Sequence, residues 1–481
     1  MAAFLIANMA PIMFASLILF LVVGYPVAFA LGANGLFFGL VGIALGLLEP
    51  ALFQALPERI FGIMFNETLL AIPFFTFMGL ILERSGMAEE LLDTIGQLFG
   101  SVRGGLAYAV IFVGALLAAT TGVVAASVIS MGLISLPIMM RYGYDHRLAA
   151  GVIAASGTLA QIIPPSLVLI VMADQLGRSV GDMYAGALVP GLLLTGVYAV
   201  YVFAYSMIKP GSAPALPPEA RTLHGAALGM RVLTSLVPPL VLIFLVLGTI
   251  FVGIATPTEG GAMGAFGALV LALMRRRLTL PLLNQAMDKT AKLTCFAIFI
   301  LVGSTVFGLS FRGVDGDLWV EHLLLGLPGG VIGFLLVVNL LVFLLAFFLD
   351  FFELAFIIVP LLAPVADKLG IDLVWFGVIL AINMQTSFMH PPFGFALFYL
   401  RSVASRDLKT GDIYRGAVPF VIMQLMMVGA VIMFPTLVTG NMEKHEKVDI
   451  ESIRIEAPPG GAYPGNIGVD DPAGLFNNDS R

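Results

Sequence analysis

Long apolar stretches separated by short polar breaks run through most of the chain. In the first half they cover residues 15–23, 26–48, 61–82, 106–140, 148–172 and 183–208; in the second half they cover residues 233–252, 260–274, 292–311, 331–349, 354–365, 374–400 and 418–437. A hydrocarbon core about 30 Å thick is crossed by a helix of about 20 apolar residues, and several stretches reach that length. The pattern predicts an all-α polytopic membrane protein.

The longest internal polar break, residues 209–231, divides the apolar stretches into two groups. Its start is rich in proline and glycine, which end helices, so residues 211–232 are expected to link a first membrane repeat (1–210) to a second (233–440). Residues 441–481 are charged and rich in glycine and proline, and are expected to form a disordered tail. The run Arg275-Arg276-Arg277 adjoins an apolar stretch and marks the cytoplasmic side.

Composition narrows the class of protein. Charged residues make up 11% of the chain and hydrophobic residues 59%, with a net charge of −6. Soluble proteins carry about 25% charged residues, so a soluble enzyme, a disulfide-rich domain and a disordered chain are excluded. The chain has no basic patch for a nucleic acid, and its one cysteine, Cys295, cannot form an intrachain disulfide. It has no P-loop and no catalytic motif, so we expect no enzyme activity and no cofactor, with energy coming from an ion gradient or a partner chain.

Two landmarks recur in the two halves at nearly the same spacing. Pro164-Pro165 recurs as Pro391-Pro392, and the block Gly-Asp-x-Tyr-x-Gly-Ala at positions 181–187 recurs at positions 411–417. Each copy is too long for a solenoid repeat. Duplicated halves with interrupted helices are typical of secondary transporters, and the copies are inverted if each contains an odd number of spans.

Each half also contains two apolar arms separated by a polar tip. Residues 106–119 would form a helix of roughly 21 Å, shorter than the bilayer core, before the tip Thr120-Thr121-Gly122 and a second arm. This pattern favours a re-entrant hairpin over one long tilted helix. In the second half Asp350 and Glu353 lie between the arms. Charges at that depth are costly, so the pair indicates a functional site or a protein-lined cavity, unless it forms an interfacial turn between two full spans.

The paired prolines interrupt two apolar stretches that carry small polar residues just before the break. Consecutive prolines break a helix and leave main-chain carbonyls and amides without partners. Carbonyl and hydroxyl oxygens suit an alkali cation, whereas half-helix N-termini and side-chain amides suit a carboxylate. Two such breaks at duplicated positions favour a binding site over structural kinks. The candidate side chains are Ser156, Thr158 and Gln161 before the first break, and Asn383, Gln385, Thr386 and Ser387 before the second, with His390 inside it, where a structural histidine is favoured over a proton carrier.

At these residues the sequence resembles the large membrane subunit of a tripartite ATP-independent periplasmic (TRAP) transporter. The resemblance is carried by residues 72–79, 156–166, 181–190, 253–259 and 390–394, and it extends over roughly residues 10–440. It implies two inverted repeats that form a scaffold and an elevator-type transport domain, with two hairpins and two broken helices. It also implies sodium-coupled uptake of an organic acid across the bacterial inner membrane, with a periplasmic substrate-binding protein and a separate small four-helix membrane subunit. The alternative is a stand-alone sodium/carboxylate symporter of the same superfamily.

The resemblance also assigns roles by position. Sodium ions, bound mostly by backbone carbonyls, would lie at Thr120, Ala160, Ile163, Pro165 and Thr386. The substrate would lie between the two tips, near Thr121, Gly122, Ser156, Thr158, Gln161, Asp350, Glu353, Asn383, Gln385, Ser387 and His390. The chain departs from the family pattern at Ala160, where a glycine is expected, and in its longer tail. The motif at residues 390–394 suggests the branch associated with keto acids, hydroxy acids or similar carboxylates.

Overall fold

The computed structural model describes residues 2–121, 124–440 and 442, and the described chain is built of helices without a strand. The predictions for Gly122 and for the tail after residue 442 lie outside these residues. Seven helices within the described ranges are long and apolar enough to cross a membrane, and an eighth span is possible if the bent pair α15 and α16 counts as one. The predicted all-α polytopic fold is confirmed.

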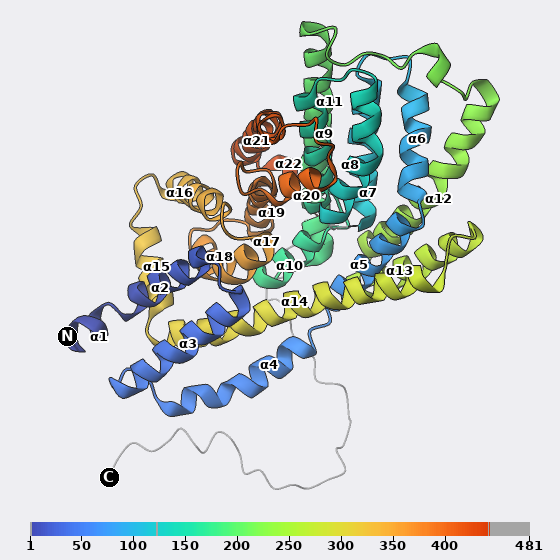
Figure 1. Ribbon diagram of the computed structural model, residues 1–481. Coiled ribbons are helices and arrows are strands. Elements are labelled where there is room, and N and C mark those ends of the chain that lie inside the picture. The colour runs from blue at the N-terminus through green and yellow to red at the C-terminus, as the bar shows by residue number, and fades with distance from the viewer. Residues whose placement is uncertain (1, 122–123, 441, 443–481) are drawn as a thin grey trace, which may run out of the picture. The chain divides into compact units, whose positions relative to one another are not determined.

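The first half of the chain contains eleven α-helices among the residues described (Figure 1). They are α1 (Ala2–Ala7), α2 (Met9–Val23), α3 (Val27–Ala44), α4 (Leu56–Met64), α5 (Ala71–Arg84), α6 (Met87–Phe99), α7 (Gly105–Thr121), α8 (Val124–Arg141), α9 (His146–Thr158), α10 (Leu167–Leu176) and α11 (Val180–Ile208). The second half contains α12 (Gly225–Phe251), α13 (Pro257–Met274), α14 (Leu280–Gly313), α15 (Gly316–Leu325), α16 (Gly330–Leu345), α17 (Phe351–Glu353), α18 (Val359–Lys368), α19 (Leu373–Gln385), α20 (Phe395–Val403), α21 (Thr410–Met433) and α22 (Thr436–Thr439).

Two helices of the first half correspond in length and spacing to two helices of the second half. Helices α9 and α19 both have 13 residues, and their first residues keep the spacing of the paired prolines, as do the single-turn 3₁₀ helices that follow them. Helices α3 and α13 both have 18 residues, and their first residues keep the spacing of the Gly-Asp-x-Tyr-x-Gly-Ala block. The repeat that two short motifs indicated therefore extends to whole helices.

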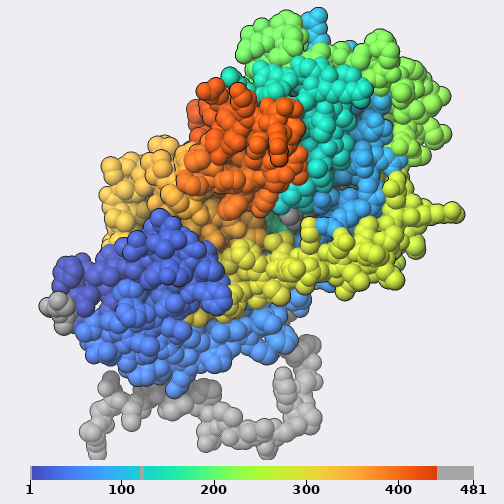
Figure 2. All heavy atoms as spheres, viewed as in Figure 1, coloured from blue at the N-terminus to red at the C-terminus, as the bar shows by residue number. Residues whose placement is uncertain are grey.

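Helices of one half pack against helices of the other. Helix α3 lies along α14, and α5 lies along α13, so each repeat supports the other (Figure 1). The contact between α3 and α14 is close because a Cβ at Gly303 would lie 2.5 Å from the carbonyl oxygen of Ala28. Figure 2 shows the N-terminal helices in blue directly against the yellow surface of α14. The membrane body is thus interlocked across the two repeats, and small residues allow its backbones to approach closely.

Residues 106–140 fold back on themselves. Helices α7 and α8 pack against each other, and both pack against α9. The amide of Leu106, at the start of α7, donates a hydrogen bond of 3.2 Å to the hydroxyl of Tyr144, just beyond α8. The two ends of the segment therefore meet, which confirms a hairpin and excludes one long helix.

The structure corrects one expected span. The apolar pattern predicts a continuous segment over residues 61–82, but α4 ends at Met64 and α5 begins at Ala71. The cause is Asn66, whose side-chain oxygen accepts from the amides of Thr68 and Leu69 at 2.9 and 3.3 Å. Such local bonds compete with the helix and favour a turn.

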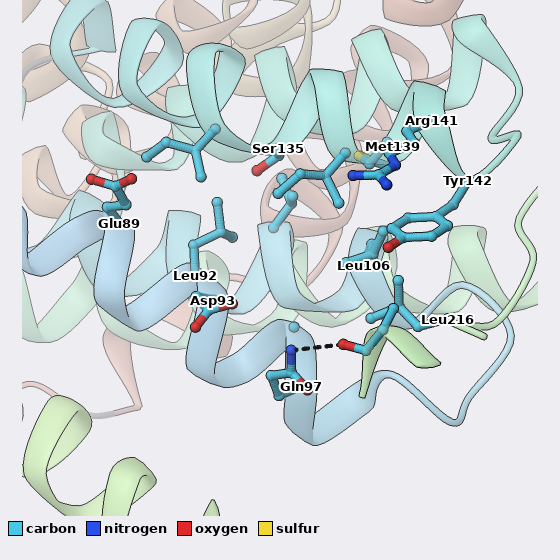
Figure 3. A pocket seen from close by; sticks show the side chains of 15 residues that line it. Glu89, Leu92, Asp93, Gln97, Leu106, Ser135, Met139, Arg141, Tyr142 and Leu216 are labelled. Carbon is cyan, nitrogen blue, oxygen red and sulfur yellow. Dashed lines mark hydrogen bonds between the residues drawn. The ribbon is translucent and has the colours of Figure 1, made fainter. Parts of the chain in front are cut away.

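Helix α12 begins at Gly225, so the last residues of the segment expected to link the two repeats (211–232) are helical. What remains is held to the first repeat by hydrogen bonds. The amide of Asp145 donates to Ser212 at 2.8 Å, and Gln97 donates to the carbonyl of Ala220 at 3.1 Å (Figure 3). The segment also helps to close a cavity of about 360 Å³ beside α6, into which the side chain of Leu92 points (Figure 3).

Candidate functional site

The first broken helix is formed by α9, a 3₁₀ turn over Leu159–Gln161, and α10. Asp145 caps α9 by accepting a hydrogen bond from the amide of Arg147 at 2.8 Å. The helix cannot continue through Pro164-Pro165, where the main chain has no donors. After the break the hydroxyl of Ser166 donates to the carbonyl of Gln161 at 2.6 Å. The predicted sodium positions Ala160, Ile163 and Pro165 are all buried here.

The second broken helix repeats this arrangement with α19, a 3₁₀ turn over Thr386–Phe388, and α20. Asp372 caps α19 by accepting from the amide of Trp375 at 2.8 Å. The hydroxyl of Thr386 donates to the carbonyl of Asn383 at 2.7 Å, which leaves its own lone pairs available. Both Pro-Pro positions therefore interrupt their helices, as predicted.

The two breaks touch at repeat-equivalent residues. The side-chain amide of Gln385 donates to the hydroxyl of Thr158 at 3.0 Å, and these two residues are 227 positions apart. Gln424 of α21 donates to the same hydroxyl at 3.3 Å and to the hydroxyl of Tyr198 of α11 at 3.0 Å. All four side chains are buried. Sequence reasoning found Thr158 and Gln385 but missed Gln424 and Tyr198, whose only signal was a polar group inside a long apolar stretch.

Several buried polar atoms around the breaks have no hydrogen-bond partner among the described residues. Buried polar atoms are normally paired, so unpaired ones indicate places for water, an ion or a polar ligand. Because most of them are oxygens, they are chemically suited to an alkali cation or to water. They are the hydroxyls of Ser156 and Ser387, both amide atoms of Gln161, and the side-chain oxygens of Asn383, Gln385 and Gln424.

Asn383 connects the second break to the preceding hairpin arm. Its amide donates to the main-chain oxygen of Asn339 at 2.7 Å and to the side-chain oxygen of Asn339 at 2.9 Å. Ser156 occupies the equivalent position in the first break, and there the contact with the hairpin arm is made through Gly114, where a Cβ would lie 2.5 Å from the Cβ of Ser156. Each broken helix is thus held against an arm of its own hairpin.

His390 is packed between two aromatic rings. The ring centroids of Phe343 and Phe347 each lie 4.3 Å from that of the imidazole. The side chain is buried, and within the described part of the chain neither of its nitrogens has a hydrogen-bond partner. Among the described residues the imidazole is therefore held by aromatic packing alone, and its role stays a prediction.

Asp350 and Glu353 form a capping box at the start of α17. Each side chain accepts a hydrogen bond of 3.0 Å from the main-chain amide of the other. Glu353 also lines a cavity of about 400 Å³ together with Tyr25 and Phe296. Their hydrogen bonds are therefore local, and in the described chain they do not join this pair to Thr158 or Gln385.

The first tip is only partly described. Thr120 and Thr121 are the last residues of α7, and α8 begins at Val124. The side chains of Thr120 and Thr121 and all of Gly122 lie outside the described structure. Their predicted roles in binding remain predictions.

Comparison with known proteins agrees with this architecture. Residues 14–437 match the family model for the tripartite ATP-independent periplasmic transporter, DctM component. A C4-dicarboxylate TRAP transporter large permease protein of Pseudomonas aeruginosa is 32% identical over 396 residues, which cover 81% of this chain and 90% of that protein. A sialic acid TRAP transporter large permease protein of Vibrio cholerae is 28% identical and covers 86% of this chain and 93% of its own.

One further relative and one solved structure bear on chain organisation and fold. An isethionate TRAP transporter permease protein, DctMQ, of Oleidesulfovibrio alaskensis is 28% identical over 400 residues, which cover 83% of this chain but only 61% of that protein. Among solved structures, the YdaH transporter of Alcanivorax borkumensis matches with a TM-score of 0.55 and 16% sequence identity, over 80% of this chain and 89% of that chain. The structural likeness supports the polytopic helical fold.

Proposed function

Because the chain belongs to the DctM components of tripartite ATP-independent periplasmic transporters, we propose that it couples sodium entry to the uptake of an organic acid. The family membership makes the chain a TRAP large permease, a multi-pass membrane protein and not an enzyme, which works with the other components of a tripartite system. Sodium as the coupling ion, the elevator mechanism and the inner membrane as the location are parts of the proposal.

The observation that supports sodium coupling most strongly is the set of unpartnered oxygens at the two breaks. Ser156, Ser387 and Asn383 present buried oxygens beside helix ends that Pro-Pro sequences interrupt. In a membrane such groups need a partner, and a desolvated cation supplies one. A cation held by neutral oxygens leaves a positive charge that would attract a carboxylate bound alongside it.

The substrate class rests on the relatives. Their names refer to C4-dicarboxylates, isethionate and sialic acid, all of which carry an acidic group. We propose a small organic acid, delivered by a periplasmic substrate-binding protein. The DctMQ relative extends well beyond the region that this chain matches, and we propose that a small four-helix membrane subunit works together with this chain.

Uptake into proteoliposomes tests this function. The chain is reconstituted with a small membrane subunit and a substrate-binding protein of the same transporter, and labelled organic acids are offered with an imposed sodium gradient. We expect uptake only with sodium, the binding protein and both membrane subunits together. Uptake by this chain alone would instead support the stand-alone symporter, and uptake driven by ATP without a sodium gradient would contradict both.

A further inference from the structure

A cavity of about 450 Å³ lies between α5, the second arm of the first hairpin, and α14. Ala125 and Ala126 line it from α8, and they follow the predicted tip almost directly. Thr76 and Arg84 line it from α5, and Lys289 and Lys292 from α14. The cavity therefore connects the region of the predicted tip with a rim of basic side chains.

The charges around the cavity favour an anion. Three lining residues are basic, Arg84, Lys289 and Lys292, and one is acidic, Glu83. Lys292 forms an exposed ion pair of 2.7 Å with Asp288, whereas Lys289 makes no ion pair within the described chain. With Asp288 counted, the rim has three positive and two negative charges. A cleft with an excess of one sign concentrates ions of the other.

The wall of the cavity contains a polar group without a partner. The hydroxyl of Thr76 is 1% exposed and has no hydrogen-bond partner in the residues described. Leaving a buried hydroxyl unpaired costs about 1–3 kcal/mol, so it calls for a water or a ligand oxygen. The one acidic lining residue, Glu83, accepts a hydrogen bond of 2.8 Å from Ser130 of α8 with one carboxylate oxygen, and its other oxygen is buried without a partner in the described residues.

The basic rim lies on the side that the arginine run marks as cytoplasmic. A Cβ at Gly86, two residues after Arg84, would lie 3.8 Å from a guanidinium nitrogen of Arg277. Arg275 forms an ion pair with Glu90 in the next helix, α6. The end of α5 and the start of α6 therefore lie together with residues 275–277, and such basic clusters favour the cytoplasmic face.

We propose that this cavity is a cytoplasm-facing vestibule that attracts the organic anion as it leaves the transport site. Lys289 and Lys292 supply the attracting charge, and Thr76 supplies a hydrogen-bonding group deeper inside. The proposal rests on the proposed transport of an organic acid, and it adds the exit route and the residues that favour anions there.

Charged thiol reagents measure the electrostatic potential in the cavity directly. Ala126→Cys is made in a Cys295→Ser background and labelled in inside-out membrane vesicles at low salt. The reagents are a negative sulfonatoethyl and a positive trimethylammonioethyl methanethiosulfonate, the sulfonate standing in for an organic anion. We expect the negative reagent to react faster. Lys289→Gln with Lys292→Gln should lower the negative-to-positive rate ratio by about tenfold, whereas Lys409→Gln, at the N-cap of α21, should leave it unchanged.

A charge-conserving variant separates charge from folding. Lys289→Arg with Lys292→Arg should keep the parent ratio. An unchanged ratio in the glutamine variant, or labelling of Ala126→Cys only from the outer side, would overturn the proposal. The labelling requires neither sodium nor the binding protein, so its failure is distinguishable from a failure of sodium-coupled uptake in proteoliposomes.

Discussion

The recurring block at residues 411–417 makes one of the closest helix contacts of the molecule, and Gly416→Ala tests it. Helix α21 crosses α9 so closely that a Cβ at Gly416 would lie 2.2 Å from the carbonyl oxygen of Arg147 and 3.1 Å from the amide nitrogen of Gly151. Both obstacles are main-chain atoms, so no side-chain rotation can relieve the clash. An added methyl must therefore force the two helices apart by about 1 Å, since carbon and oxygen normally stay more than about 3 Å apart.

The expected loss of stability in Gly416→Ala follows from two opposing contributions to the free energy of unfolding. Overpacking of a close contact costs about 1–3 kcal/mol, and replacing glycine by alanine within a helix returns about 0.5–1 kcal/mol. A Cβ at Gly429, on the same helix, would have no other atom within 4 Å, so Gly429→Ala should keep only the gain. Gly186 occupies the same place in the first copy of the block, but there the nearest atoms are valine methyl groups, the closest at 2.8 Å from Val438. Gly186→Ala should therefore fall between the other two variants.

Thermal unfolding of the purified chain in detergent, followed by size-exclusion chromatography, gives the order of the three Tm values. We expect Gly429→Ala at or above the parent, Gly186→Ala slightly below it, and Gly416→Ala lowest by several degrees. A Gly416→Ala variant as stable as Gly429→Ala would refute the close approach of α9 and α21. It would also remove the packing reason for a glycine at this place in the block.

Three further changes test the site and its surroundings. Thr158→Val removes the hydroxyl that accepts from Gln385 and Gln424, and should lower the free energy of unfolding by about 1–3 kcal/mol, as measured with denaturant. Thr386→Val removes an oxygen from the second break and should raise the sodium concentration for half-maximal uptake, with unchanged sodium dependence counting against that ion site. Burial alone would raise the pKa of Asp145, but hydrogen bonds from the Arg147 amide and the Tyr205 hydroxyl outweigh it and lower the pKa below its usual value. Asp145 should therefore stabilise the fold above its unfolded-state pKa and lose this effect as pH falls through its folded-state pKa; Asp145→Asn should flatten that part of a Tm–pH curve.

Most helices and both helix breaks could be predicted from the sequence because they depend on strong local features. Apolar length predicted the helices, and Pro164-Pro165 and Pro391-Pro392 predicted both breaks. The break at Asn66 was missed because it depends on one side chain that bonds to the amides of Thr68 and Leu69, within an apolar stretch that looks continuous. A hydropathy pattern does not contain such a local competition for hydrogen bonds.

The repeated Gly-Asp-x-Tyr-x-Gly-Ala block also shows what the sequence alone does not predict. Its recurrence was visible in the sequence, but its purpose depends on packing. Asp412 forms an ion pair of 3.2 Å with Arg147 of α9, and the hydroxyl of Tyr414 donates to the carbonyl of Pro392 at 3.3 Å. The block therefore holds α21 to the first broken helix and to the second break at once. Only the folded chain brings these residues together.

The candidate site was predictable in its polar residues but not in their partners. Residue type and position were enough to select Thr158 and Gln385, whereas Gln424 and Tyr198 became candidates only when α21 and α11 were seen beside them. For Asp350 and Glu353 the sequence indicated a possible functional site, whereas the structure shows a local contact. The two side chains form a capping box with each other's amides. A charged residue between two apolar arms can therefore cap a helix, and its hydrogen-bond partners, which the sequence does not reveal, determine this role.

The hydrogen bond between Thr158 and Gln385 also bears on how two ion sites could be coupled. It joins equivalent residues of the two repeats, and Gln424 and Tyr198 extend it to one long helix of each repeat. If one break moves, the hydrogen-bonding group of the other break must move with it or lose its partner. Leaving such a buried group unpaired costs about 1–3 kcal/mol. A cost of that size corresponds to a coupling of about five- to 150-fold between two binding events. If the breaks bind sodium as proposed, Thr158→Val should make binding at the two sites more independent, and a Hill coefficient for sodium closer to one would be the measurable sign.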